Sequence, residues 1–239
     1  MWPFRKKPEK RVAPQTGSAV FDAWMRSIHA IGEGAARLGG EHEPLTVLAP
    51  LVENELRAIE GELRRPLPRS LRDIATKASA GFNAQWSIND KGILPSELNA
   101  AKWCLLEFAA SDVISLEDHR RGWVESVFQD PNDEHNAPWH HSMPFIHVAN
   151  GDLIAFDLRS PSDDPPVIYL NHEGHYPGSG HGQCLGDNFI DFMDRWSRLG
   201  CVGPESWTWV PFYDQALGKL NPDGDNARVW RRVLLDAGA

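Results

Sequence analysis

The chain has 239 residues, of which 41% are hydrophobic and 24% are charged, as is ordinary for a soluble globular protein. Its formal net charge is -9, and basic residues gather in the first eleven positions, so the rest of the chain is strongly acidic. An acidic body argues against direct nucleic-acid binding, because phosphate groups are bound by basic patches.

The cysteines and the apolar runs of the chain indicate where in the cell the protein is expected. Cys104, Cys184 and Cys201 have neither the number nor the spacing of a disulfide framework or a zinc ribbon, which favours reduced thiols in a cytosolic protein. The basic N-terminus lacks the apolar region of a secretory signal, and no run of about 18 apolar residues is long enough to cross a membrane. We therefore expect a cytoplasmic protein without a transmembrane segment.

The N-terminal region divides into a tail and a helix. Residues 1–17 are basic and contain three spaced prolines, so they are predicted to be a disordered tail. From about Ser18 to Leu38, apolar residues recur at three- and four-residue steps, which predicts a helix that ends at Gly39-Gly40. Its apolar stripe is expected to pack on the main body, with a dimer or partner seam as the alternative. Residues 18–45 would thus add one helix to a single domain over residues 46–239.

Two more helices are predicted before the first long strand. One begins near Thr46, and prolines after residue 65 break it. The other starts at Ser70, whose spacing to a following aspartate resembles a capping box, and Gly81 is placed to be its C′ residue. Strands are predicted at residues 84–89 and 123–128, with a short helix from Pro95 to Phe108 between them and a polar loop over residues 129–143.

A three-strand meander is predicted from Pro144 to Glu173. Asn150-Gly151 separates two alternating apolar runs, and both residues tolerate the positive φ of a two-residue type I′ turn. A third apolar run at residues 167–170 follows a polar loop at residues 159–166. A Gly- and His-rich loop, an Asn188-capped helix, a strand at residues 207–212 and a closing helix at residues 225–235 complete the chain. The order of elements indicates an α+β fold with paired N-terminal helices on a mostly antiparallel sheet, followed by C-terminal helices.

Several short motifs in this order resemble those of the SUKH superfamily, which groups Smi/Knr-type cell-wall-assembly regulators with bacterial immunity proteins. The resemblance covers about residues 46–213. The N-terminal motif comprises Leu56-Arg-Ala-Ile59-Glu60, Leu67-Pro68-Arg-Ser-Leu71 and Gly81-Phe82. The second half comprises Asn150-Gly151-Asp152, Ile154-Ala155-Phe156-Asp157, the run from Val167 to His172 and Phe189-Ile190-Asp191-Phe192.

The resemblance implies an α+β fold and, for bacterial members, a non-enzymatic protein that binds and neutralises a polymorphic toxin, often a nuclease or deaminase. A regulatory scaffold of the cell-wall-assembly type is the alternative. The shared positions would be mainly structural. Leu67-Pro68 would form the corner between two helices, Gly151 would supply the positive φ of the turn, and Asp152 and Asp157 would bond to nearby backbone.

Seven histidines in the second half raise a third alternative, a metal-dependent hydrolase. They are His135, His140, His141, His147, His172, His175 and His181. However, His172-Glu173-Gly174-His175 is one residue shorter than the zinc-protease motif, which needs two histidines at i and i+4 on a helix. No Gly-x-Ser-x-Gly sequence or phosphate-binding loop is present. The sequence therefore predicts no catalytic residue, no metal ligand and no cofactor.

Acidic loop residues are the candidate partner-binding side chains. Asp130, Asp133, Glu134 and Trp139 share one predicted loop, Asp163 and Asp164 share another, and Glu173 borders a third. Carboxylates around an aromatic anchor suit a basic, nucleic-acid-cleaving partner. The alternative is that these are solvated loops and that Trp139 fills a crevice in its own domain.

Overall fold

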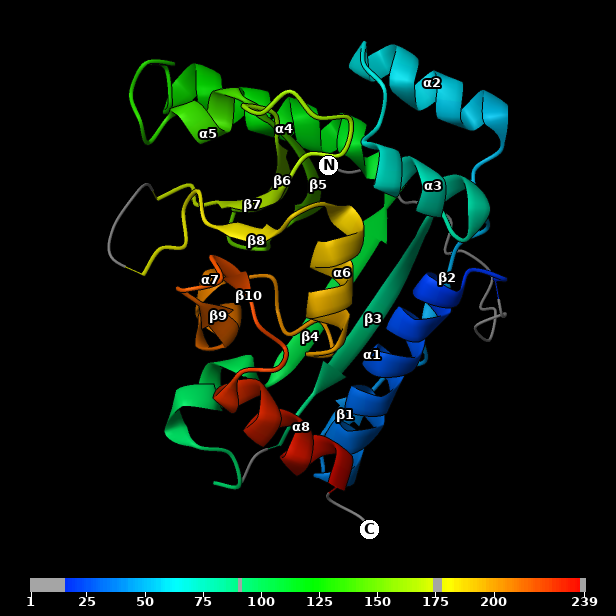
Figure 1. Cartoon of the computed structure of the whole chain (residues 1–239), viewed down its shortest axis with the longest axis vertical. Helices are drawn as coiled ribbons and strands as arrows, with labels where there is room; N and C mark the ends of the chain where they lie inside the picture. Colours follow the sequence, from blue (N-terminus) through cyan, green and yellow to red (C-terminus); the bar gives the residue numbers. More distant parts are fainter. Residues whose placement is uncertain (1–15, 90–91, 174–177, 237–239) are drawn as a thin grey trace.

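The computed structural model describes residues 16–89, 92–173 and 178–236. Its centre contains two antiparallel sheets, with helices around them (Figure 1). The predicted α+β class, with helices at both ends of the chain and antiparallel strands, is confirmed. Among the described residues, no helix combines the length and the apolar character that a membrane span requires.

Helix α1 (Ala19–Arg37) forms as expected and packs on the main body. The side chain of Ser18 caps its N-terminus, and Gly39, with φ of +80°, follows its C-cap residue. Trp24 and Phe21 are buried, and their rings lie 6.0 Å from those of Phe189 and Phe82 respectively. The apolar stripe of α1 is therefore part of the central core rather than an exposed contact surface for a dimer or another partner.

Helix α2 (Glu53–Leu63) begins later than predicted. Thr46 and Val47 instead form the short strand β2, because Pro50 disfavours helical backbone just before it. Helix α3 (Arg69–Lys77) follows the link that contains buried Leu67, with Pro68 as its N-cap residue. The Ser70 capping box is not formed, because its hydroxyl donates to Asp164 instead, and Gly81 begins a strand rather than ending this helix.

The first sheet surrounds strand β3 (Gly81–Ser87). Strands β1 (Glu41–His42) and β2 (Thr46–Val47) pair with one edge of β3, and β4 (Trp103–Ala109) pairs with the other. The helix predicted from Pro95 to Phe108 is wrong beyond its first half. A 3₁₀ helix occupies Ser96–Ala101, and then Cys104, Leu106 and Phe108 alternate with exposed residues as a half-buried strand does.

Helix α4 (Val113–Ser126) replaces the strand predicted at residues 123–128. Its inward side chains are Val113, Leu116 and Trp123, which follow a helical period when the whole segment is considered. A 3₁₀ turn at Ala110–Asp112 precedes it, and the short helix α5 (Ala137–His140) interrupts the predicted loop 129–143.

The second sheet contains the predicted meander. It has the order β5 (Ser142–His147), β6 (Leu153–Asp157), β7 (Val167–Leu170) and β8 (Cys184–Gly186), all antiparallel. Ile154 and Phe156 face the central core, whereas Leu153 and Ala155 face a second cluster beneath α4. Burial on both faces explains why β6 and β7 are continuous apolar runs.

The turn between β5 and β6 differs from the predicted type I′ hairpin. Gly151 has φ of +103°, as expected, but Asn150 is not among the described residues with positive φ. The amide of Gly151 donates to the carbonyl of Val148, and the amide of Val148 donates to that of Asp152. The connection is therefore a three-residue loop, in which only the last position requires glycine.

The C-terminal elements pack against β8 of the second sheet and against α1. Asn188 caps helix α6 (Phe189–Ser197) as predicted, and helix α8 (Asp225–Asp236) closes the fold beside α1. The strand predicted at residues 207–212 is wrong, because helix α7 (Ser206–Trp209) and a 3₁₀ turn at Val210–Phe212 occupy this segment. A two-stranded ribbon, β9 (Tyr213–Asp214) and β10 (Lys219–Leu220), precedes α8.

Candidate interaction face

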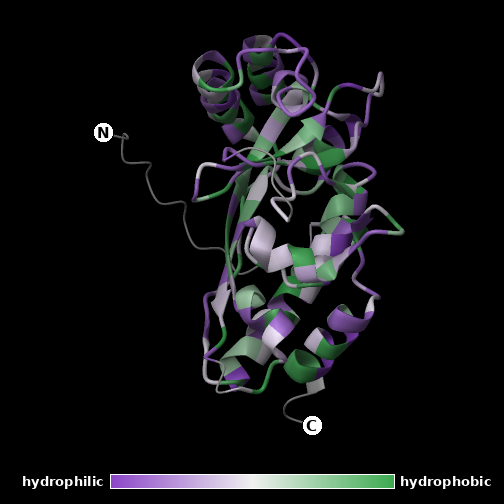
Figure 2. Ribbon diagram, turned by 90° about the vertical axis from the view of Figure 1, so that its left-hand side faces the viewer, coloured by the Kyte–Doolittle hydropathy of each residue, from purple (hydrophilic) through white to green (hydrophobic). Residues whose placement is uncertain are grey.

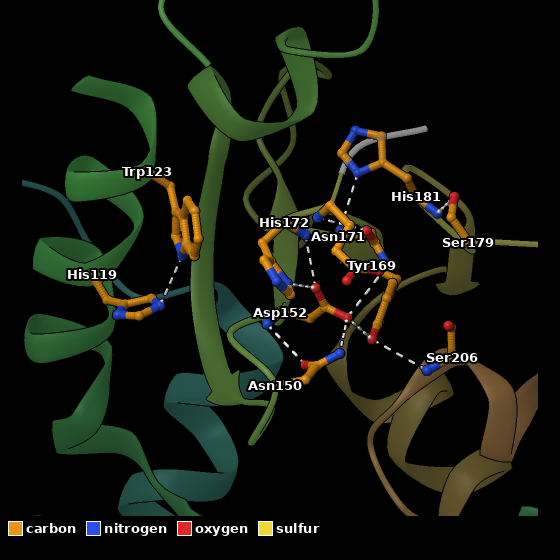
Figure 3. A network of polar contacts seen from close by, with 11 residues as sticks. His119, Trp123, Asn150, Asp152, Tyr169, Asn171, His172, Ser179, His181 and Ser206 are labelled. Atoms are coloured by element: carbon orange, nitrogen blue, oxygen red, sulfur yellow. Dashed lines mark hydrogen bonds and ion pairs between the residues drawn. The ribbon is translucent and has the colours of Figure 1, made fainter. Parts of the chain in front are cut away.

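Asp152, at the end of the β5–β6 turn, lies at the centre of a polar network (Figure 3). Its carboxylate is completely buried. It accepts hydrogen bonds from the hydroxyl of Tyr169 at 2.5 Å and from the side-chain amide of Asn150 at 2.7 Å. The backbone amide and Nδ1 of His172 both lie 2.7 Å from its other oxygen. These donors replace the water that a buried carboxylate loses.

The network connects three loops. The hydroxyl of Tyr169 accepts from the amide of Ser206, at the start of α7, while it donates to Asp152. Burial and the adjacent Asp152 raise the pKa of Tyr169 above its ordinary range, so the hydroxyl stays protonated and keeps donating. The β5–β6 turn, the end of β7 and the start of α7 are therefore held together by one buried carboxylate.

A second buried carboxyl group adjoins Asp152. Glu205 is buried, and its Oε2 has no hydrogen-bond partner within the described part of the chain. Burial raises the pKa of Glu205, and the negative charge of Asp152 raises it further. Sequence reasoning missed Glu205, since a glutamate just before a serine gives no signal of burial.

On its other side, the network continues to the surface through aromatic rings. The ring of His172 lies 5.1 Å from that of Trp123, and the indole of Trp123 donates to Nε2 of His119. His119 in turn lies 5.4 Å from the ring of His147. Burial lowers the pKa of His147, and His119 lowers it further.

The pairing of Asp152 with His172 resembles the base and orienting acid of a nucleophilic triad. Among the described residues, however, no serine hydroxyl or cysteine thiol hydrogen-bonds to His172. In the described part of the His-rich loops, no three His, Cys, Asp or Glu side chains come close enough to share a metal ion. His175 lies outside the described residues. This arrangement fixes loops and, in the described ranges, shows neither a nucleophile nor a metal centre.

His181 joins two of the loops singled out from the sequence. Its Nδ1 accepts from the amide of Asn171, and its Nε2 lies 2.7 Å from the carbonyl oxygen of His135, to which it donates. These contacts fix one neutral tautomer of the ring. They also hold the loop at residues 129–136 against the β7–β8 loop.

The first acidic loop is exposed and internally ordered. A carboxylate oxygen of Asp130 accepts from the amide of Asn132, and one of Asp133 accepts from the amides of His135 and Asn136. The side chain of Glu134 is 87% exposed. This loop lies at the upper end of the molecule, where the loops are mostly hydrophilic (Figure 2). Glu173 is exposed in the β7–β8 loop.

Trp139 does not have the predicted role of an exposed anchor. It is completely buried in α5 and stacks on Phe128 with ring centroids 4.7 Å apart.

Trp207, on α7, is instead 51% exposed. Its neighbours Ser206 and Trp209 lie against Gly180 of the β7–β8 loop, so α7 adjoins the loop that His181 holds. The exposure of Trp207 on a helix was not predicted, because the spacing of Trp207 and Trp209 is that of alternate residues in a strand.

The loop with Asp163 and Asp164 is attached to α3 instead. The carbonyl of Asp163 accepts from the amide of Arg69, and its side chain is 76% exposed. The Asp164 side chain is only 8% exposed, and its carboxylate accepts from both the amide and the hydroxyl of Ser70. Asp164 therefore caps α3 from a distant loop and is not available to a partner.

The remaining motif residues have local structural contacts. Asp157 accepts from the amide of Arg159 and forms an ion pair with its side chain. At Gly81, an added Cβ would clash with the carbonyl oxygen of Phe108, so glycine permits the close pairing of β3 with β4. The three cysteines are free.

Comparison with known proteins identifies a family. The model of the SMI1 / KNR4 family (SUKH-1) matches residues 50–195, which is more than half of the chain and runs from before α2 into α6. Searches of curated proteins and of solved structures found no match. The superfamily identified from the sequence motifs is confirmed.

Proposed function

The chain belongs to the SMI1/KNR4 (SUKH-1) family, and from this membership we propose that it is a non-enzymatic immunity protein of the cytoplasm. It binds a polymorphic toxin, of the nuclease or deaminase type, and neutralises it by covering the active site. The main structural support for this proposal is the exposed acidic loop at residues 129–136. A hydrogen bond from His181 holds this loop against the β7–β8 loop.

We define the acidic face as Asp130, Asp133, Glu134, Glu173 and Trp207. Its four carboxylates complement the basic surface with which a nucleic-acid-cleaving domain attracts its substrate. Trp207 supplies the exposed aromatic side chain that dominates binding energy at many interfaces. The ordered loop also lowers the entropy cost of binding, since Asp133 and His181 already fix its backbone.

A non-enzymatic role is supported by the use of the polar side chains. Asp152, Tyr169 and His172 are engaged with one another and with backbone groups. A catalytic site would instead present a nucleophile or base to an open cleft. Free cysteines suit the reducing cytoplasm.

A regulatory scaffold of the cell-wall-assembly type is the second function that the family suggests. In that role, residues 1–45 would serve as a docking element for a partner. The burial of Trp24, Ile28 and Ile31 against the main body argues against it, because α1 cannot leave without opening the core.

Protection of cells tests the proposal. A toxin domain found by screening the products of neighbouring genes is expressed with wild-type protein or with the triple variant D130K/D133K/E134K. We expect full protection by the wild type and loss of protection by the variant at equal protein levels. Equal protection by both would refute the role of the acidic face in toxin binding. Failure of the wild type to protect would refute the immunity function.

The matched control reverses three other exposed acids, in the variant E41K/E43K/E97K. It changes the net charge by the same amount, but β1 lies at the opposite end of the molecule from α5 (Figure 1). Glu97 belongs to the 3₁₀ helix that leads into β4, and β4 begins beside the same end of β3 with which β1 pairs. We expect this control to protect as the wild type does, because only local charge complementarity is required.

A further inference from the structure

Two histidines and a glutamate meet between α1 and β1, outside the residues that match the family model. His29 and Glu33 are four residues apart on α1, so they lie on one face of the helix, and His42 comes from β1. Each offers one ligand atom, and these atoms all lie within 4.8 Å of one another. Nδ1 of His42 is 3.2 Å from Oε1 of Glu33, and its ring lies 5.2 Å from that of His29.

The local sequence brings His42 to this position. Gly39 and Gly40 reverse the chain after α1, and a Cβ on Gly40 would clash with the carbonyl group of Ser87. Pairing of His42 with Trp86 then fixes β1 beside β3. On the helix, a Cβ at Gly32 would clash with the ring of His42. Only glycine at that position allows the imidazole to approach α1 so closely.

The environment of His42 is unusual for a histidine that serves packing alone. Its side chain is 8% exposed, and its Nε2 is buried without a hydrogen-bond partner among the described residues. Buried polar atoms are nearly always paired, because an unpaired one keeps its full desolvation cost. A Cβ on Gly32 would meet the Nε2 edge of the ring, whereas Nδ1 faces Glu33, so Nδ1 is the atom that His42 offers to a ligand shared with Glu33.

We propose that His29, Glu33 and His42 bind one divalent transition-metal ion of the zinc type. Two imidazole nitrogens and a carboxylate oxygen are zinc ligands, whereas calcium and magnesium prefer oxygen ligands alone. His29 and Glu33 are exposed, so a fourth position is open to water.

The ion connects the N-terminal helix to the edge of the first sheet. Because binding requires the folded arrangement of α1 and β1, the ion stabilises this arrangement by mass action. The role is structural and independent of the acidic face. The simple alternative is a hydrogen bond between His42 and Glu33 without any ion.

The test uses untagged, metal-free protein titrated with Zn²⁺ against a chromogenic chelator, and with Co²⁺ to observe the absorption of the coordinated ion. We expect one equivalent to bind and the thermal midpoint to rise with Zn²⁺. His29→Ala and Glu33→Gln should each weaken binding by more than about tenfold and abolish the thermal shift. Both side chains are exposed, so these variants are expected to fold, and Gln keeps an acceptor for His42.

The control is His141→Ala, which removes an exposed histidine that belongs to no group of three among the described residues. Its Zn²⁺ affinity should equal that of the wild type. The proposal is overturned if the wild type binds no stoichiometric Zn²⁺, or if His29→Ala and Glu33→Gln bind it as tightly as the wild type does.

Discussion

At the scale of single residues, Asp152 carries its negative charge inside the protein and is balanced by hydrogen-bond donors from three segments. Tyr169, His172 and Asn150 all donate to its two oxygens. Hydrogen bonds to a charged group contribute more than neutral ones, and removing the charge leaves the donors facing a poorer acceptor. The buried carboxylate is therefore a main determinant of loop geometry near the acidic face.

We expect Asp152→Asn to lower the free energy of unfolding by about 2–4 kcal/mol, because the amide group offers one acceptor where the carboxylate offered two. Urea denaturation of the wild type and the variant measures the difference. Asp133→Asn is the control, since that side chain is exposed and only its loop depends on it. Equal stability of Asp152→Asn and the wild type would show that the network does not stabilise the fold.

His147 gives a pH-dependent prediction. Burial and then His119 lower its pKa below 6.5 in the folded protein. Protonation therefore favours the unfolded chain, and the stability contribution of His147 is full above about pH 6.5 and is lost as the pH falls. In an NMR titration, His119→Gln should raise the pKa of His147 but leave it below 6.5, because burial is the larger cause. A pKa unchanged by this substitution would contradict the coupling.

Residue roles were only partly predictable from the sequence. The positive φ of Gly151 followed from turn chemistry, which is local. The burial of Trp139 and the exposure of Trp207 depend on which helix covers which sheet face, and no local pattern encodes that.

At the scale of elements, helix α3 begins with a cap from another loop. Asp164 accepts the amide and hydroxyl of Ser70 across 94 residues of chain. A carboxylate at the N-terminus of a helix satisfies a free amide and interacts favourably with the helix dipole.

Asp164→Ala should lower the free energy of unfolding by about 1 kcal/mol, the usual effect of losing an N-cap. Asp163→Ala, next to it in the same loop, removes an exposed carboxylate and should have little effect, since the hydrogen bond from the Arg69 amide goes to the Asp163 carbonyl. Thermal denaturation compares the two variants. A larger loss for Asp163→Ala would contradict the assignment of the cap.

Helices were predicted correctly where the apolar period extended along the whole element. Elements were assigned wrongly where a short stretch of sequence was compatible with both a helix and a strand. The helices α1 and α6 have long stripes and clear caps, and both were found. The six residues from Trp123 alternate like a strand, but the full segment from Val113 is helical. Likewise, β4 is recognisable as a strand only from its pairing with β3, a contact made after folding.

At the scale of the whole molecule, the core extends beyond the residues that match the family model. Helix α1 packs on β3 and α6, and the side chain of Arg37 donates to the carbonyl of Leu234 in α8. The sequence predicted the α+β class from the order of its elements. It did not predict that the two ends of the chain complete one core, because α1 and α8 contact each other although Arg37 and Leu234 are 197 residues apart.

Deletion of residues 1–45 should abolish cooperative folding, because it exposes the core surfaces that Phe21, Trp24 and Ile28 cover, each of which contributes about 1.5–3 kcal/mol when fully buried. Deletion of residues 1–15 keeps all of α1 and should leave the thermal transition in place. Circular dichroism with heating distinguishes them. A cooperative transition in the longer deletion would show instead that α1 is a detachable arm.

Binding of a basic toxin domain by the acidic face is the property on which the proposed function depends. The most direct measurement is the dissociation constant of the full chain for a toxin domain identified among the products of neighbouring genes, by calorimetry at two salt concentrations. We predict a nanomolar value for the wild type and for E41K/E43K/E97K, and a value at least about tenfold weaker for D130K/D133K/E134K, with less salt dependence. An equal dissociation constant for the two triple variants would contradict the proposed interface.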